Sequence, residues 1–445
     1  MMLKNKVLKF FNDFNIYIVN STWGLTERVF SLGVSFLITI LVARYLGPAQ
    51  FGLFSYATAL FALFSILGGV GVGVLVERDL SKHPNFKQEI MGTSFRLMGF
   101  GFLLGLILLW GFLLLSENIQ SEVFWLLLIL SISYFFYPFY IINHWFASRL
   151  EFKYPSLALM ISIFISSIIK IALVIGGAHL ILFAYANVIQ VILTATILIF
   201  FYKYKSKLNL FAWRFSYTRA KELLSQSWMI YLGSFFAVIY LRVDQVMLKW
   251  LVGVEEVGIY VVAATLSQAL YFLPSAIVNS FFPKLIKLKE NNPTHFNKRL
   301  QQIFDLLFVM AFGVAIVTTL VAEPLITMLF GQVYQDAGHI LTIHIWVALF
   351  IFMNALFAKW IVIENVLIFF MLMHAVGALF NVALNYWLIP HYGAVGAAYA
   401  TLLSYATSSY LLLLLYSKTR PIFWMMTKSI FSPIRYSIYI LREKL

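Results

Sequence analysis

Twelve apolar stretches constrain the fold of this 445-residue chain more than any other feature. A helix needs roughly 20 apolar residues to cross the hydrocarbon core of a bilayer. With 62% hydrophobic and 11% charged residues, the composition also excludes a soluble domain of this length. The sequence therefore predicts an all-α polytopic membrane protein with about twelve transmembrane helices. The stretches lie at 22–46, 51–76, 93–115, 122–146, 156–176, 180–202, 226–251, 257–282, 303–322, 339–360, 366–389 and 393–416.

The distribution of positive charge predicts how the spans are oriented. Of the 32 Lys and Arg residues, 27 lie in the terminal segments and in the gaps on one side of the predicted membrane. The gaps on the other side contain none. Because basic gaps face the cytoplasm, we expect both termini to be cytoplasmic. The formal charge of +14 is dispersed over short segments, which favours anionic membrane lipids as partners and argues against nucleic acid.

The largest basic gap divides the chain into halves of six predicted spans each. An even number of spans makes both halves enter the membrane from the same side, so a repeat would be parallel, with a pseudo-two-fold axis along the membrane normal. Gly47 and Gly52 correspond to Gly253 and Gly258 at a constant offset of 206 residues, which supports such a repeat. The predicted parts are a cytoplasmic interfacial segment at 1–21, an N-lobe of spans 1–6 at 22–202, a cytoplasmic inter-lobe linker at 203–225, a C-lobe of spans 7–12 at 226–416 and a basic cytoplasmic tail at 417–445.

Motifs of enzymes and metal sites are absent. The chain has no G-x-x-x-x-G-K-[ST] for ATP and no H-E-x-x-H or paired D-x-D for a metal. It has no Cys, which excludes disulfides and thiolate chemistry. His144, His344 and His374 lie in or near spans, but the sequence places no acid beside them, as a membrane-embedded transferase would need. We predict no catalytic residue, cofactor or metal, and a protein that is not an enzyme.

Charged residues deep inside spans predict a polar site. An ionised side chain at the centre of a span costs about 2.5–3.5 kcal/mol on insertion scales, so such residues usually face a cavity or a partner. Arg28, Lys170 and Arg242 are of this kind, with Glu27 and Asp244 as the nearby acids. Residues i and i+2 of a helix diverge, so Arg242 and Asp244 do not face each other. Three cations against two acids predict a cationic central cavity that suits an anionic substrate group; structural ion pairs are the alternative.

Arg44 and Lys249 are two further cations, close to the predicted outer boundary of the membrane. Long basic side chains at this depth reach the interface and anchor a helix there. We therefore expect anchoring, with a role as outer-end cations of the cavity as the second interpretation.

Four segments carry a family resemblance. They are Ala43–Gly52, Arg242 and Asp244 ahead of Gly258-Ile259-Tyr260, Glu323–Tyr334, and Asn381–Thr401. In this order and spacing the chain resembles the bacterial polysaccharide-repeat-unit translocases, or O-antigen flippases, of the multidrug/oligosaccharidyl-lipid/polysaccharide exporter superfamily. The resemblance implies two six-helix lobes around a central cavity that alternates between inward-open and outward-open states.

The resemblance also implies a function. The substrate would be a polyprenyl-diphosphate-linked oligosaccharide of O-antigen, capsule or a similar polysaccharide, flipped from the cytoplasmic to the outer leaflet of the bacterial inner membrane. A polysaccharide polymerase and a chain-length regulator would be further partners. Arg28, Lys170 and Arg242 would bind the diphosphate, and Asp244 or Glu27 would couple an ion or proton or balance charge. A cation-coupled multidrug exporter of the same superfamily is the main alternative and a transferase acting on lipid-linked groups the second; the cationic interior favours the flippase.

Overall fold

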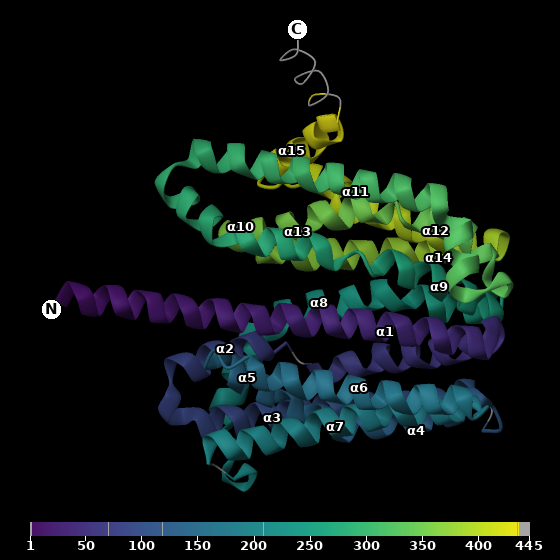
Figure 1. Cartoon of the computed structure of the whole chain (residues 1–445), viewed down its shortest axis with the longest axis horizontal. Coiled ribbons are helices and arrows are strands. Elements are labelled where there is room, and N and C mark those ends of the chain that lie inside the picture. The colour runs from purple at the N-terminus through teal and green to yellow at the C-terminus, as the bar shows by residue number, and fades with distance from the viewer. Residues whose placement is uncertain (1, 70, 118, 208, 434, 436–445) are drawn as a thin grey trace. The chain divides into compact units, whose positions relative to one another are not determined.

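The computed structural model describes residues 2–69, 71–117, 119–207, 209–433 and 435, and these contain helices but no β-strand (Figure 1). Side chains of residues 2–19, 21 and 367 lie outside the description. Most of the predicted 1–21 segment therefore lies outside the described side chains, and residues 434 and 436–445 of the predicted tail lie outside the described residues. The helices are α1 (Met2–Gly69), α2 (Gly73–Lys82), α3 (Lys87–Ser116), α4 (Glu122–Ser131), α5 (Ile141–Ser148), α6 (Lys153–Ile175), α7 (Leu180–Ser206), α8 (Tyr217–Leu251), α9 (Val254–Gln268), α10 (Phe272–Asn291), α11 (Pro293–Phe330), α12 (Asp336–His344), α13 (Val347–Ile363), α14 (Leu367–Ser409) and α15 (Arg420–Ile430), with short 3-10 helices at Pro84–Phe86, Ile132–Phe135, Tyr137–Tyr140, Leu210–Ala212 (η4), Gln332–Tyr334 and Leu411–Leu414.

These helices confirm the predicted all-α polytopic membrane fold. Within the described residues, nine helical runs are long and apolar enough to cross a membrane, and the bent pair Glu122–Phe135 and Tyr137–Ser148 would make a tenth. Two of the nine, Thr22–Lys82 and Ile368–Leu414, have 61 and 47 residues, and each holds two of the predicted spans. The number of twelve spans in two symmetric lobes stays a prediction.

Glycine breaks the two double-length runs. Gly47 has φ 70° inside α1 and Gly393 has φ 56° inside α14, both in the left-handed region that glycine adopts without a steric penalty. Pro48 follows the first break and Pro390 precedes the second. A reversal of the chain between two spans is therefore encoded locally at each of these glycines.

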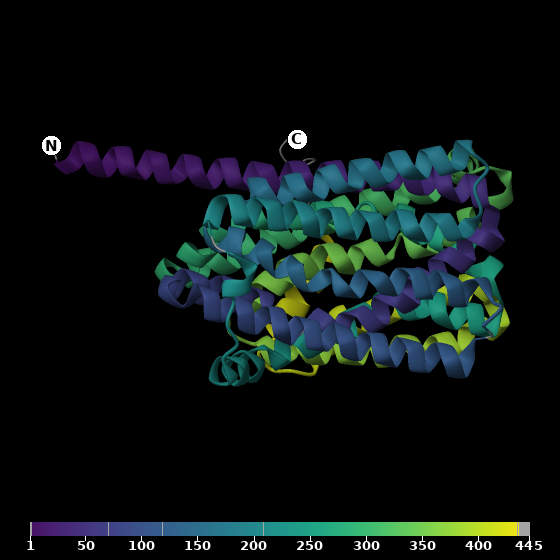
Figure 2. The ribbon, with the colours of Figure 1, turned by 90° about the horizontal axis from the view of Figure 1, so that it is seen from below.

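The chain folds into two compact units. Unit 1 comprises Met1–Leu46 with Ala57–Phe235, and unit 2 comprises Gly47–Tyr56 with Phe236–Leu445. In unit 1, α6 and α7 pack closely and run side by side in both views (Figure 1, Figure 2). Many apolar side chains of α3, such as Phe100, Ile107 and Leu115, are exposed, as lipid-facing residues are.

The two matching glycine motifs meet within unit 2. A methyl group on Gly52 would lie 1.8 Å from the carbonyl oxygen of Val254, and one on Gly258 would lie 2.1 Å from that of Pro48. Neither position has room for a side chain, so the start of α9 and the segment after Gly47 approach backbone to backbone. Small residues permit such close packing of membrane helices.

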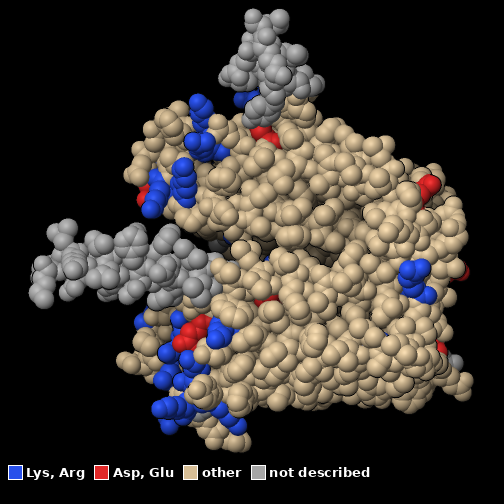
Figure 3. Space-filling model, viewed as in Figure 1, with Lys and Arg blue, Asp and Glu red and all other residues tan. Residues whose placement is uncertain are grey.

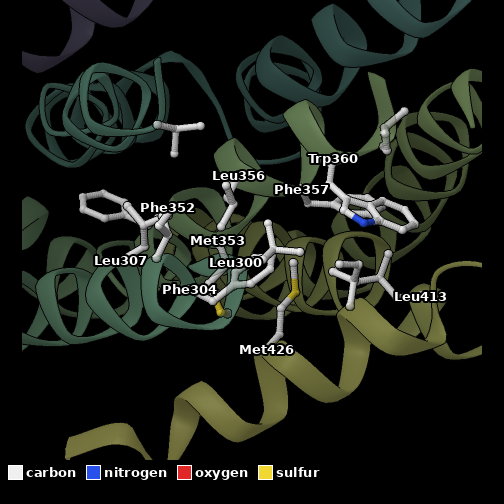
Figure 4. Packing of buried hydrophobic residues seen from close by; sticks show 14 of the residues in the cluster. Leu300, Phe304, Leu307, Phe352, Met353, Leu356, Phe357, Trp360, Leu413 and Met426 are labelled. Atoms are coloured by element: carbon white, nitrogen blue, oxygen red, sulfur yellow. The ribbon is translucent and has the colours of Figure 1, made fainter. Parts of the chain in front are cut away.

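A dense apolar cluster holds α10, α11, α13, α14 and α15 of unit 2 together (Figure 4). Phe304, Phe352 and Phe357 are fully buried there, and Leu413 and Met426 join them from the C-terminal part of the chain.

Basic residues lie mainly at the ends of helices. Figure 3 shows Lys and Arg gathered at one end of the helices in each unit, while the rest of the visible face is mostly uncharged. This clustering at helix ends is typical of a membrane protein with one basic side.

Candidate functional site

The buried carboxylate of Asp244 is the centre of a polar cluster inside unit 2. Tyr260 Oη donates a hydrogen bond to Asp244 Oδ2 at 2.6 Å, and Thr401 Oγ1 donates to the same oxygen at 2.8 Å. Asn385 Nδ2 donates to Asp244 Oδ1 at 2.5 Å. Only 3% of Asp244 is exposed, so its charge depends on these donors or on a cation for stabilisation.

Three helices supply the cluster. Asp244 comes from α8, Tyr260 from α9, and both Asn385 and Thr401 from α14, on opposite sides of the break at Gly393. Asn381 lies one turn before Asn385, and its Oδ1 accepts a hydrogen bond from Asn385 Nδ2 at 3.0 Å. The break in α14 thus lets one helical run present polar groups to Asp244 from two directions.

Unit 2 contains several buried polar atoms without a hydrogen-bond partner, two of them in this cluster. Asn381 Nδ2 and Asn385 Oδ1 are buried without a hydrogen-bond partner, and so are Tyr240 Oη, Asn354 Oδ1 and Ser404 Oγ elsewhere in unit 2. A buried polar atom without a partner costs about 1–3 kcal/mol, so such atoms usually mark a bound water or ion. Two such atoms, Asn381 Nδ2 and Asn385 Oδ1, belong to the Asp244 cluster itself.

A cavity of about 240 Å³ lies one helical turn from Asp244. Tyr240 on α8 and Tyr405 on α14 line it, each four residues from a member of the cluster, and their ring centroids are 4.4 Å apart. Tyr240 and Asn354 line this space, which is large enough for several waters of about 30 Å³ each in the liquid. The Asp244 cluster therefore lies one helical turn from a cavity of unit 2.

The cations singled out from the sequence lie elsewhere. Arg28 is exposed on α1 and Lys170 is half-buried on α6, both in unit 1, whereas Arg242 is exposed on α8 in unit 2. Among the described residues, none of the three forms an ion pair within its own unit. Glu27 accepts a hydrogen bond from Ser31 Oγ at 3.1 Å. Their convergence on one cavity stays a prediction, because they belong to different units.

The outer-end cations differ from each other. Arg44 is exposed, three residues before the break at Gly47. Lys249 Nζ lies 4.8 Å from the ring centroid of Tyr56, which is a cation–π contact, and Tyr56 Oη accepts a hydrogen bond from Trp250 Nε1 at 3.1 Å. The anchoring of Arg44 and Lys249 at the interface stays a prediction.

One expectation about histidine is wrong. The sequence places no acid beside His144, but Glu77 Oε1 lies 2.7 Å from His144 Nδ1. The two residues are 67 positions apart on α2 and α5, so no local spacing reveals the pair. Gly73 makes room for it, because a methyl group there would lie 2.5 Å from the imidazole. Among the described residues, no group of three His, Asp or Glu side chains could hold a metal ion.

Sequence reasoning missed most of the Asp244 cluster. Tyr260, Asn381 and Thr401 occur in the segments that carry the family resemblance, yet nothing in the sequence assigns them to a site. Two Asn residues four positions apart in an apolar span, on one face of a helix, are the signal that could have found it.

The fold and this buried polar centre define a polytopic helical membrane protein, and the comparisons with known proteins specify its family. The family model described as "Polysaccharide biosynthesis protein" matches residues 18–289, which is more than half of the chain. The chain belongs to this family, and the family membership predicted from the motifs is confirmed.

Curated relatives are similar over most of the chain. One, from Haloferax volcanii, is named "Probable flippase AglR" and is 27% identical over 400 residues, covering 85% of this chain and 79% of the relative. Another, from Shigella flexneri, is named "Putative O-antigen transporter" and is 25% identical over 428 residues, covering 90% of this chain and 98% of the relative.

Solved structures show the same fold. The lipid II flippase MurJ in an inward closed conformation has a TM-score of 0.70 at 17% identity, covering 95% of this chain and 93% of that one. A multidrug resistance MATE family transporter of the MOP superfamily, in an inward-facing conformation, has a TM-score of 0.61 at 15% identity, covering 88% of this chain and 94% of that one.

Proposed function

We propose that this protein flips lipid-linked oligosaccharides across a membrane. The match of the family model over residues 18–289 carries the proposal, and both curated relatives are named for flipping or transport. The protein is a transporter rather than an enzyme. The likeness to a drug-transporter structure concerns the fold alone and gives the multidrug alternative no better support than the flippase.

At finer detail, the substrate is a polyprenyl-diphosphate-linked repeat unit, moved from the cytoplasmic to the outer leaflet of the bacterial inner membrane by alternating access. Both termini would be cytoplasmic, and a polysaccharide polymerase and a chain-length regulator would act on or with the product. The direction has a physical source. A potential of 100 mV is worth about 2.3 kcal/mol per elementary charge, and an inside-negative potential drives an anionic headgroup outward.

Arg28, Lys170 and Arg242 would bind the diphosphate. Support comes from their position inside apolar helices without an ion-pair partner in their own unit, among the described residues. A guanidinium group offers a planar pair of donors that matches a phosphate oxygen pair, and an ammonium group adds a compact charge.

Asp244 would bind the coupling cation, either a proton or a small monovalent metal ion. Hard cations prefer oxygen ligands, and the carboxylate of Asp244 lies next to the hydroxyl oxygens of Tyr260 and Thr401. The cluster has a single formal negative charge, which matches one positive charge and leaves no excess for a divalent ion. Glu27 would be the second candidate for ion or proton coupling, or would balance charge.

Transport in proteoliposomes tests the proposal. Purified protein is reconstituted with a fluorescent polyprenyl-diphosphate oligosaccharide, and its arrival in the opposite leaflet is followed by accessibility to a membrane-impermeant lectin. We expect flipping that exceeds protein-free vesicles and that an inside-negative potential accelerates when the basic segments face inward. Vesicles that export an ethidium-type cation but leave the oligosaccharide in place would refute the flippase in favour of a drug exporter.

A further inference from the structure

The segment between α7 and α8 is fastened to the start of α3 in unit 1. Arg214 N donates a hydrogen bond to the carbonyl oxygen of Gln88 at 3.1 Å, and Ser216 N donates to Thr93 Oγ1 at 3.0 Å. Gly92 allows the approach, because a methyl group there would lie 2.4 Å from the carbonyl oxygen of Arg214. The segment is therefore part of the folded unit and forms one wall of the space between it and α3.

A cavity of about 430 Å³ opens between this segment and the ends of α3 and α7. Its wall is aromatic: the ring of Phe95 lies 4.9 Å from that of Phe139 and 5.4 Å from that of Trp213. Trp213 is buried, and its Nε1 donates a hydrogen bond to Tyr202 Oη at 3.0 Å, which fixes the ring in place. The volume falls in the range of small-molecule sites, roughly 300–1,000 Å³.

Two cations and no acid line this cavity. Arg96 and Lys203 are both exposed at its edge. The Arg96 guanidinium makes only long contacts with two carbonyl oxygens, 3.5 Å to Gly92 and 3.4 Å to Trp213. Most of its donors therefore point to no protein acceptor, and the cavity combines an apolar wall with a cationic rim. That combination matches a ligand with an anionic head and an apolar body.

The surroundings indicate that the ligand comes from a membrane. Phe211, at the cavity edge, is 94% exposed, and Tyr204 and Tyr217 are 70% and 77% exposed. Exposed aromatic rings beside basic residues are favourable at the headgroup level of a bilayer and unfavourable in water. Figure 3 shows Lys and Arg gathered over this corner of unit 1, where α7 ends. Such charges are attracted to an anionic leaflet.

We propose that this cavity binds one anionic glycerophospholipid of the cytoplasmic leaflet. The phosphate lies between Arg96 and Lys203, and the glycerol and upper acyl chains pack on Phe95, Phe139 and Trp213. Because the lipid contacts both the α7–α8 segment and α3, it holds that segment on unit 1. The inference depends on the basic side facing the cytoplasm and not on the flipping of an oligosaccharide.

Lipid binding by the full-length protein tests the site. Protein is delipidated in detergent, titrated with phosphatidylglycerol or phosphatidylcholine, and the bound lipid is counted by native mass spectrometry. We expect one phosphatidylglycerol to bind at least about tenfold more tightly than phosphatidylcholine, and Arg96→Gln with Lys203→Gln to remove this preference. Lys205→Gln with Lys207→Gln is the matched control, because it removes two neighbouring charges that do not line the cavity, and it should keep the tight lipid.

Three outcomes would overturn the proposal. The first is an equal loss of lipid in both double variants, which would indicate general surface charge. The second is an affinity for phosphatidylcholine equal to that for phosphatidylglycerol, which would show no preference for an anionic headgroup. The third is displacement of phosphatidylglycerol by polyprenyl diphosphate at lower concentration, which would make the cavity a substrate site. The double variant Arg96→Lys with Lys203→Arg conserves both charges. It should keep the melting temperature of the wild-type protein and retain the bound lipid, which shows that the two charges are needed for lipid binding and not for folding.

Discussion

Asp244 illustrates how much a single buried charge depends on its neighbours. Tyr260 and Thr401 donate to one carboxylate oxygen and Asn385 donates to the other, so these three hydrogen-bond partners are all neutral groups. An ionised carboxylate whose donors are all neutral favours a cation nearby, as the proposed coupling role requires. A cavity lined by Tyr240 and Tyr405 lies one helical turn away.

The first prediction concerns this carboxylate. Asp244→Asn keeps the size of the side chain and one acceptor oxygen, so the protein should remain in the membrane. It should lose the acceleration of flipping by a proton or sodium gradient, because the bound cation loses its charge partner. Initial rates in proteoliposomes with and without each gradient measure this. Asp336→Asn, an exposed acid at the start of α12, is the control and should keep the gradient effect; a gradient effect that survives in Asp244→Asn would exclude Asp244 as the coupling site.

The second prediction concerns the three cations. Alanine at Arg28, Lys170 or Arg242 should abolish polymer display at the cell surface while leaving protein in the membrane, because each removes a charge for the diphosphate. Lysine at the two arginine positions should retain part of the activity. Lys298→Ala, an exposed basic residue near the start of α11, is the control. Normal polymer in a strain with expressed Arg242→Ala would assign Arg242 a structural role.

At the scale of elements, the breaks within helices α1 and α14 determine how the polar centre is assembled. Gly47 and Gly393 end one span and begin the next, and the break in α14 brings Thr401 to the same carboxylate as Asn385. Gly52 and Gly258 then let α9 and the segment after Gly47 approach without side chains between them. The polar centre thus depends on a backbone arrangement that a few glycines permit.

The third prediction tests this arrangement. Gly258→Ala places a methyl group 2.1 Å from a carbonyl oxygen of Pro48, so the backbone must move. Overpacking of this kind destabilises by about 1–3 kcal/mol. The melting temperature in detergent should fall, whereas Gly313→Ala, in open space on α11, should leave it unchanged or slightly higher. An unchanged melting temperature for Gly258→Ala would show that the contact accommodates a methyl group without loss of stability.

For the whole molecule, the predicted orientation in the membrane would set the direction of the proposed transport. A reporter fused after Lys207 should be cytoplasmic, and one fused at Gln120 or His179 should be outside, because the basic gaps stay on the cytoplasmic side. Alkaline phosphatase and green fluorescent protein fusions report the two locations with opposite signals. One robust inversion among these three sites would overturn the predicted topology, and with it the inside-negative drive for export.

The sequence by itself determined that the chain is an all-α polytopic membrane protein and to which family it belongs. Span length follows from bilayer thickness, and composition and glycine spacing are local properties that a single chain displays. The same local information identified Asp244 as a buried acid and Arg242 as unable to face it.

Only the tertiary structure decided which groups surround Asp244. Tyr260 is 16 residues away, Asn385 is 141 and Thr401 is 157, and helix periodicity indicates a polar face without indicating which helix it meets. The pairing of Glu77 with His144 and the cavity beneath the α7–α8 segment arise in the same way. Such contacts depend on the packing of whole helices, which a one-dimensional pattern of apolar residues leaves undetermined.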